Sequence, residues 1–196
     1  MHLLLIAGFL GSGKTTLVIR LAKAARESGR RVAILVNEIG EIGIDDQLMR
    51  QLSLNVWEMV SGCLCCTLSG DLINTLQLLD DDYQPDLVLL EPSGVAEPGN
   101  ILKLLPYYRG RPLAGVRSIT LIDPLRAQML YEVLTPLITA QIQRADMLLV
   151  TKTDIASAEE MAQVRQIAGE LNPAAKLFCV SAKEAIAPEL MAELLA

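Results

Sequence analysis

Residues 8–15, with the sequence GFLGSGKT, combine the residue types that bind phosphate. They fit the pattern G-x-x-x-x-G-K-[ST] at every fixed position. Glycines in such a loop allow backbone N–H groups to converge on phosphate oxygens at the positive end of a helix. Lys14 can then reach the β- and γ-phosphates, and Thr15 can bind Mg²⁺. The segment therefore predicts a nucleoside triphosphate site, whose other contacts here are expected to be Gly11, Ser12, Gly13 and Thr16.

Residues 151–154, with the sequence TKTD, have the chemistry to bind guanine and resemble the [NT]-K-x-D motif of GTP-binding proteins. The Asp154 carboxylate would accept from guanine N1–H and from the exocyclic amino group together. Adenine lacks this donor pair and would leave the carboxylate unpaired, so GTP is favoured over ATP. The stem of Lys152 can lie across the base, and Thr151, where many GTPases have Asn, can brace the loop. A further loop resembles the S-A-K loop that contacts guanine O6 through its backbone; it consists of Ser181, Ala182 and Lys183.

Three thiols lie within four residues, at Cys63, Cys65 and Cys66. Cys63 and Cys65 would share one face of an extended segment, and Cys66 can join them if the chain turns into a helix. Converging thiolates suit Zn²⁺ or another borderline-to-soft ion, and a fourth position would be open or filled from elsewhere. Small apolar packing and reactive thiols without metal are the alternatives. Cys179 lies in an apolar segment and is interpreted as a core residue.

Strand-like and helix-like segments alternate along the chain, with each polar motif directly after an expected strand. This alternation predicts an α/β protein, a P-loop NTPase fold with a mostly parallel sheet and helices on both faces. Ligands of such folds bind at the carboxyl ends of the strands. The expected strands are 3–7, 31–36, 56–60, 86–90, 116–122, 147–150 and 176–180, and the expected helices are 16–25, 71–79, 125–143, 158–171 and a short closing helix.

The bulk composition fits a compact α/β protein and argues against two classes of partner. The 196 residues are 52% hydrophobic and 20% charged, which predicts one domain with a sizeable core. A net charge of −6 argues against binding to nucleic acid or to anionic membranes. No run approaches the roughly 18 apolar residues of a membrane span. A cytoplasmic location is expected, where cysteines stay reduced.

Taken in order, these motifs resemble the CobW-like branch of the CobW/HypB/UreG/MeaB GTPases. The resemblance covers nearly the whole chain, and its specific part is the G-C-x-C-C element between the nucleotide motifs. It implies a slow, Mg²⁺-dependent GTPase that assists delivery of a metal or metallocofactor to a client enzyme, often as a dimer. The segments that carry it are 8–16, 36–46, 62–66, 91–94 and 151–154.

The resemblance also implies ligands for the transferred ion, which could be zinc, cobalt, nickel or iron. Cys65 and Cys66 are implicated most, with Cys63 and Glu41 assisting. Val36 stands where many members have Glu, so one carboxylate ligand is absent. Over 1–196 we expect a single GTPase domain without the C-terminal CobW-type domain, which leaves the client, a metalloenzyme or a corrinoid protein, unidentified.

Further roles follow from the chemistry of phosphoryl transfer, in which the protein mainly positions groups and neutralises charge. Lys14 is expected to neutralise the β- and γ-oxygens. Glu91, at a strand end, is expected to support Mg²⁺ or orient water, and the Gly94 N–H to bind the γ-phosphate. Asp45 or Asp46 is expected to order the attacking water or Mg²⁺, and the sequence does not separate the two.

The leading hypothesis is a metallochaperone in which GTP, GDP and metal binding are coupled. The γ-phosphate would order residues 37–46 and 91–97, and the cysteines lie between these segments. A second hypothesis is a regulatory GTPase that gates a cofactor-dependent partner, for example a corrinoid enzyme, without carrying metal. A small-molecule kinase is a third, disfavoured by residues 151–154 and by the lack of a basic lid. A nucleotide-dependent homodimer is compatible with the first two.

Overall fold

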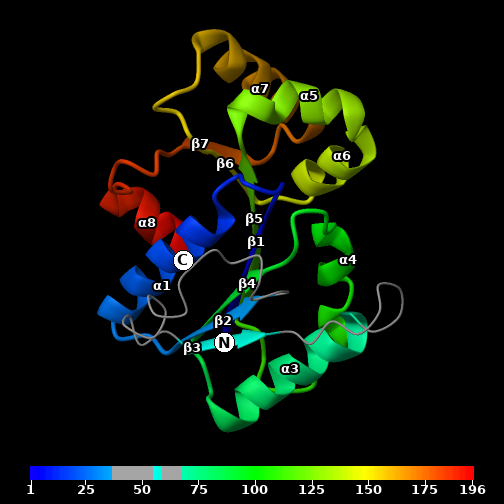
Figure 1. The fold of residues 1–196 in the computed structure, drawn as a ribbon. Helices are drawn as coiled ribbons and strands as arrows, with labels where there is room; N and C mark the ends of the chain where they lie inside the picture. Colours follow the sequence, from blue (N-terminus) through cyan, green and yellow to red (C-terminus); the bar gives the residue numbers. More distant parts are fainter. Residues whose placement is uncertain (37–54, 59–67) are drawn as a thin grey trace.

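The computed structural model of the chain describes residues 1–36, 55–58 and 68–196 (Figure 1). Its described strands form one seven-stranded sheet in the order β3-β2-β4-β1-β5-β6-β7, and every neighbouring pair is parallel. The predicted α/β class with a parallel sheet is therefore confirmed. The strands are β1 (His2–Gly8), β2 (Val32–Val36), β3 (Asn55–Glu58), β4 (Leu87–Glu91), β5 (Gly115–Ile122), β6 (Met147–Val150) and β7 (Lys176–Cys179).

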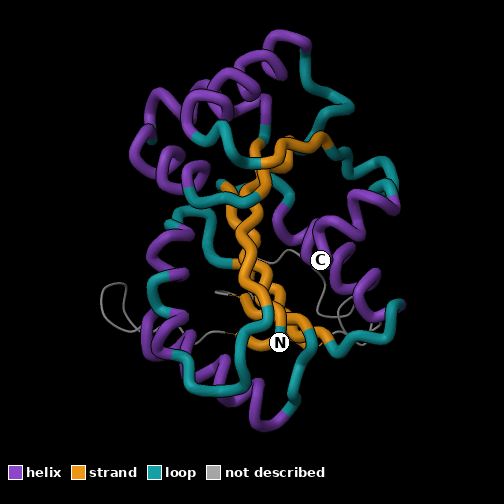
Figure 2. The backbone as a smooth tube through the Cα atoms, turned by 180° about the vertical axis from the view of Figure 1, so that it is seen from behind, coloured by secondary structure: helices purple, strands orange, loops and turns teal. Residues whose placement is uncertain are grey.

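Helices cover both faces of the sheet, and the strands run through the middle of the molecule (Figure 2). Alternate residues of the central strand β1 point to opposite faces: Leu4 and Ile6 pack against α1 and α8, whereas Leu3 and Leu5 pack against α3. A strand buried on both faces has a continuous apolar sequence, as this one does. The helices are α1 (Lys14–Glu27), α3 (Leu68–Asp82), α4 (Pro98–Leu102), α5 (Pro124–Val133), α6 (Thr135–Gln143), α7 (Ala158–Leu171) and α8 (Pro188–Leu195).

The side chains on the two faces of β1 belong to two apolar clusters. A third cluster lies where α5, α6 and α7 pack on β6, and it includes Leu148, Val150 and Val164. The helical pattern over 125–143 forms two helices rather than one, because Pro136 lies in the first turn of α6 and cannot donate a hydrogen bond into a continuous helix. The short helix α4 and the 3₁₀ turn at Leu105–Tyr107 were not predicted. Among the described residues, no helix is long and apolar enough to cross a membrane.

The interpretation of Cys179 as a core residue is wrong. Cys179 is exposed and is the last residue of β7. β7 is the last strand in the sheet and pairs only with β6; its two end residues are exposed and its two central residues are only partly buried. An apolar sequence pattern does not distinguish such an edge strand from a central one.

Candidate nucleotide site

The phosphate loop connects β1 to α1 at the carboxyl edge of the sheet. Gly13 caps the helix with a φ of 97°, a left-handed conformation that side chains other than glycine rarely adopt. Lys14 begins the helix, is 7% exposed, and donates from Nζ to the Phe9 carbonyl at 3.4 Å. The loop therefore wraps around its lysine, and its amides lie at the N-terminus of α1, where an anion is favoured.

Thr15 of α1 contacts Glu91 of β4, the strand next to β1. Thr15 Oγ1 donates to Glu91 Oε1 at 2.7 Å, because β1 and β4 are neighbours and Glu91 ends β4. A hydroxyl that donates its proton to a carboxylate keeps its lone pairs for a cation. Hydroxyl and carboxylate oxygens also match the hard oxygen ligands of Mg²⁺. These two residues therefore fit the magnesium role expected for them.

Gly94 lies in the loop that follows β4, in contact with the phosphate loop. A Cβ atom on Gly94 would lie 2.6 Å from the backbone nitrogen of Leu10, so a side chain could not be accommodated without displacing backbone. The close approach places the loop after β4 directly beside the loop that binds phosphate. Thr15 and Glu91 thus contact each other, and Gly94 contacts the phosphate loop, as expected for groups that bind Mg²⁺ and the terminal phosphate.

Thr151 joins the loop after β6 to the phosphate loop. Its Oγ1 lies 2.9 Å from the Ser12 carbonyl and 3.3 Å from the Ile122 carbonyl, and the residue is 8% exposed. A single hydroxyl proton directed at the Ser12 carbonyl supplies the bracing contact expected of this position. Threonine therefore performs here the bracing that an asparagine would be expected to give.

Asp154 and the Ser181 loop come together from the ends of β6 and β7. Ser181 Oγ donates to Asp154 Oδ1 at 2.9 Å, and Lys183 Nζ lies 2.7 Å from Asp154 Oδ2. The hydrogen bond from Lys183, followed by that from Ser181, lowers the pKa of the Asp154 carboxyl below its usual value. Asp154 is therefore held as a carboxylate, the acceptor that the guanine donors require.

Lys152 pairs with Asp123, a residue to which the sequence analysis assigned no role. Lys152 Nζ lies 2.6 Å from Asp123 Oδ2, and Asp123 is 6% exposed. The other carboxylate oxygen accepts from the Leu125 N–H at 3.2 Å, which makes Asp123 the N-cap of α5. The sequence could have indicated a role for Asp123 at the site, because this residue directly follows β5, the strand next to β1. Asp123 thus orients the lysine whose stem is expected to lie along the base.

Arg20 is a second residue that the sequence analysis missed. From the second turn of α1, its guanidinium donates to the carbonyls of Ser181 at 3.1 Å and Glu184 at 2.9 Å, and also to that of Ala182. No local pattern indicated this, because the partners are more than 160 residues away in the sequence. The arginine fixes the loop that is expected to face guanine O6.

A pocket of about 260 Å³ opens between the phosphate loop, α1 and the Ser181 loop. It is bounded by residues from four loops or helices, so a ligand there would contact every predicted nucleotide-binding segment except the Glu91–Gly94 region. Its lining includes Gly11, Gly13, Thr16, Arg20, Lys152, Ser181 and Ala182. The structure therefore brings the expected base contacts and phosphate contacts to one edge of the sheet.

The remaining predicted residues lie outside the described part of the chain. These are Glu41, Asp45 and Asp46, within the segment 37–46 that the γ-phosphate is expected to order (the first switch), and Cys63, Cys65 and Cys66 of the thiol cluster. Within residues 1–36, 55–58 and 68–196, no group of three or more histidine, cysteine or acidic side chains is arranged to hold a metal. The proposed metal ligands therefore remain predictions.

Comparison with known families decides the class of this site. Residues 2–179 match the family described as "CobW/HypB/UreG, nucleotide-binding domain". The chain belongs to this family. The resemblance inferred from the motifs is thereby confirmed, and the matched residues include the phosphate loop and the loops after β4 and β6 described above.

Relatives in the CobW/HypB/UreG family carry names that bear on function. The chain is 32% identical to the zinc chaperone CobW of Pseudomonas aeruginosa, covering 95% of this chain and 58% of the relative. It is also 32% identical to the zinc chaperone YjiA of Escherichia coli, over 90% of this chain and 56% of the relative. The chain thus spans a little over half the length of these curated relatives.

A solved structure supports the fold. The Zn(II)-bound YjiA GTPase from E. coli superimposes with a TM-score of 0.68, covering 100% of this chain and 62% of that chain, at 24% identity. At this identity the likeness shows the fold alone. The expectation of a GTPase is confirmed at the level of the family by a curated relative: the zinc-regulated GTPase metalloprotein activator 1 of Schizosaccharomyces pombe is 30% identical, over 89% of this chain and 44% of the relative.

Proposed function

We propose that this chain is the GTPase domain of a zinc chaperone, which binds GTP with Mg²⁺, hydrolyses it slowly and couples the nucleotide state to metal delivery to a client metalloenzyme. The observation that carries the proposal is the convergence of segments from four strand ends on one edge of the sheet. The phosphate loop, the Glu91–Gly94 region and the Asp154–Ser181 pair come from the ends of β1, β4, β6 and β7. Family membership supplies the metal-handling context.

The base contacts favour guanine. Asp154 is held as a carboxylate by Ser181 and Lys183, and Arg20 holds the backbone of the same loop. A carboxylate that other side chains already hold in place can accept from guanine N1–H and from the amino group without reorganising. Adenine lacks this donor pair and would leave the carboxylate without a partner from the base. GTP and GDP are therefore the proposed ligands, in preference to ATP.

The phosphate end positions groups for hydrolysis. Lys14 and the loop amides would hold the β- and γ-oxygens, and the Gly94 N–H would donate to the γ-phosphate. Thr15, backed by Glu91, would hold Mg²⁺, which when bound neutralises charge on the phosphates. Asp45 is proposed to order the attacking water, with Asp46 as the alternative. Slow turnover is what the resemblance to the CobW-like GTPases implies.

The transferred ion would bind to Cys65 and Cys66, assisted by Cys63 and Glu41. Two relatives named as zinc chaperones support zinc as the ion, and thiolate ligands suit it. The cysteines lie in sequence between the first switch and the Glu91–Gly94 region, so γ-phosphate binding is proposed to favour the metal-holding geometry. Hydrolysis to GDP would then weaken the site and release the ion to the client.

A metal titration of the reduced protein tests this function. Co²⁺ is added as a zinc probe in the presence of excess Mg²⁺ and a non-hydrolysable GTP analogue, and again with GDP, while thiolate-to-metal charge-transfer bands are recorded. We expect one equivalent to bind, and to bind more weakly with GDP. A Cys65→Ala/Cys66→Ala variant should lose the bands while binding nucleotide normally. Absence of thiolate binding in both states would instead favour a GTPase that regulates a partner without carrying metal.

A further inference from the structure

Gln141 is a buried polar residue that lies against the loop containing Gly94. It is 2% exposed and belongs to α6. Its side-chain amide donates two hydrogen bonds from Nε2, to the Gly94 carbonyl at 3.1 Å and to the Ala96 carbonyl at 3.0 Å. A buried amide is costly unless its donors are satisfied, so these two bonds determine where the loop can lie.

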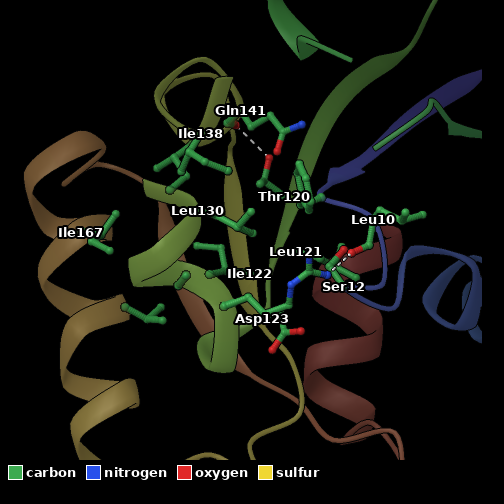
Figure 3. A pocket seen from close by; sticks show the side chains of 15 residues that line it. Leu10, Ser12, Thr120, Leu121, Ile122, Asp123, Leu130, Ile138, Gln141 and Ile167 are labelled. Carbon is green, nitrogen blue, oxygen red and sulfur yellow. Dashed lines mark hydrogen bonds between the residues drawn. The ribbon is translucent and has the colours of Figure 1, made fainter. Parts of the chain in front are cut away.

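The helix end that carries Gln141 is itself fixed to the sheet. Thr120 Oγ1 on β5 donates to the Gln141 carbonyl at 2.9 Å, and Thr120 is 2% exposed (Figure 3). Thr120 and Gln141 line an apolar cavity together with Leu130 and Ile138. The helix backbone at Gln141 is therefore anchored to β5, which fixes the point from which the side chain reaches the loop.

The loop is held from its other sides as well. The Ala96 N–H donates to the Ser93 carbonyl at 3.0 Å, which closes a turn over residues 93–96. On the opposite side, Gly94 is in close contact with Leu10 of the phosphate loop. The turn thus lies between the phosphate loop and Gln141, and two of its carbonyl groups point to one amide.

We propose that Gln141 is a positioning residue for γ-phosphate recognition. Its amide holds the turn 93–96 in the conformation in which the Gly94 N–H can meet the γ-phosphate. This inference rests on the proposed GTP-binding role of Gly94. Because GDP has no γ-phosphate, Gln141 contributes to the affinity for GTP and leaves that for GDP unchanged. The residue thereby sets how strongly the domain distinguishes its two nucleotide states.

The test compares nucleotide affinities of Gln141→Met, which keeps the side-chain length and removes both donors. The matched control is Gln143→Met, at an exposed position of the same helix. Dissociation constants for a non-hydrolysable GTP analogue and for GDP are measured by calorimetry with Mg²⁺. We expect the analogue to bind about tenfold more weakly to Gln141→Met, the effect of one to two lost hydrogen bonds, with GDP within about twofold of wild type.

Equal weakening of both nucleotides, or no change in either, would overturn the proposal. If Gln141→Met does not fold, the same affinities are measured for Gln141→Glu. This variant has the same shape as the wild type but replaces the two-proton amide donor with a carboxyl group. We expect a GTP-selective loss that partly recovers as the pH is lowered and the carboxyl group gains a proton to donate. A GTP-selective loss without any such recovery would count against positioning by donated hydrogen bonds. Failure of the wild-type protein to bind the GTP analogue would refute the proposed function itself.

Discussion

Asp154 illustrates how the selectivity of this site depends on groups from a different loop. Its two oxygens are engaged by Ser181 and Lys183, from beyond β7. The hydrogen bonds from Lys183 and then Ser181 lower the pKa of the Asp154 carboxyl, the acceptor expected for both guanine donors. The motif at 151–154 predicted the acceptor, whereas the groups that hold it appear only in the fold.

Changing Asp154 to asparagine should change which base the site prefers. Asn presents N–H donors where the carboxylate only accepted, so it fits xanthine, which has a carbonyl in place of the guanine amino group. We expect Asp154→Asn to lose about 100-fold in GTP affinity and to prefer xanthosine triphosphate. Competition against a fluorescent nucleotide measures both, with the exposed Asp82→Asn as the control. Retained GTP preference in Asp154→Asn would exclude the proposed base contact.

At the scale of elements, α1 connects the two ends of the nucleotide site. Its first residue, Lys14, lies in the phosphate loop, and Arg20, two turns later, binds the carbonyls of the Ser181 loop. One rigid helix therefore sets the distance between the phosphates and the base. This role belongs to the helix, and neither residue alone provides it.

Replacing Arg20 should impair base recognition more than phosphate binding. Arg20→Met keeps the apolar stem but leaves three carbonyl acceptors without their guanidinium donor. We expect the ratio of GTP to ATP affinity to fall about tenfold while affinity for inorganic triphosphate stays the same. Lys23→Met, at an exposed site on the same helix, should change neither. A parallel loss for triphosphate would show that Arg20 supports the whole helix instead.

The elements of this fold were largely predictable because parallel strands buried on both faces leave continuous apolar runs. The strand at Met147–Val150 and the helix at Ala158–Leu171 have the predicted bounds. The division between α5 and α6 was missed, although Pro136 was a visible signal. Contacts such as Arg20 with Ser181 could not be predicted, since hydrogen bonds between distant loops depend on strand order, which local patterns do not determine.

At the scale of the whole molecule, a partly buried ion pair between Asp80 and Arg111 joins α3, on the face opposite α1, to the segment that precedes β5. Asp80 on α3 has a side chain that is only 4% exposed; it accepts from the Arg111 backbone N–H at 2.6 Å and from the Arg111 guanidinium. Burial raises the pKa of the Asp80 carboxyl, but these hydrogen bonds outweigh burial and the pKa is lowered overall. The carboxylate therefore stabilises the fold in its ionised form.

This ion pair predicts a specific acid sensitivity. The folded-state pKa lies below the unfolded value of about 3.9, so the stabilisation is complete above that value and is lost as the pH falls through the folded pKa. We expect Asp80→Asn to lower the free energy of unfolding at pH 7 by about 1–3 kcal/mol. The difference from wild type should shrink as the pH falls below about 4, as followed by urea denaturation. A difference independent of pH would mean that the charge of Asp80 is not responsible.

The central claim for the whole molecule is that the nucleotide site and the thiol site are coupled. Coupling free energies are reciprocal, so zinc must tighten GTP by the factor by which GTP tightens zinc. The most direct measurement is the dissociation constant of a fluorescent, non-hydrolysable GTP analogue with and without one equivalent of Zn²⁺. Excess Mg²⁺ prevents zinc from binding the free nucleotide, and Cys65→Ala/Cys66→Ala is the control. We predict tighter analogue binding with zinc in the wild type only; an affinity that zinc leaves unchanged would contradict the coupling.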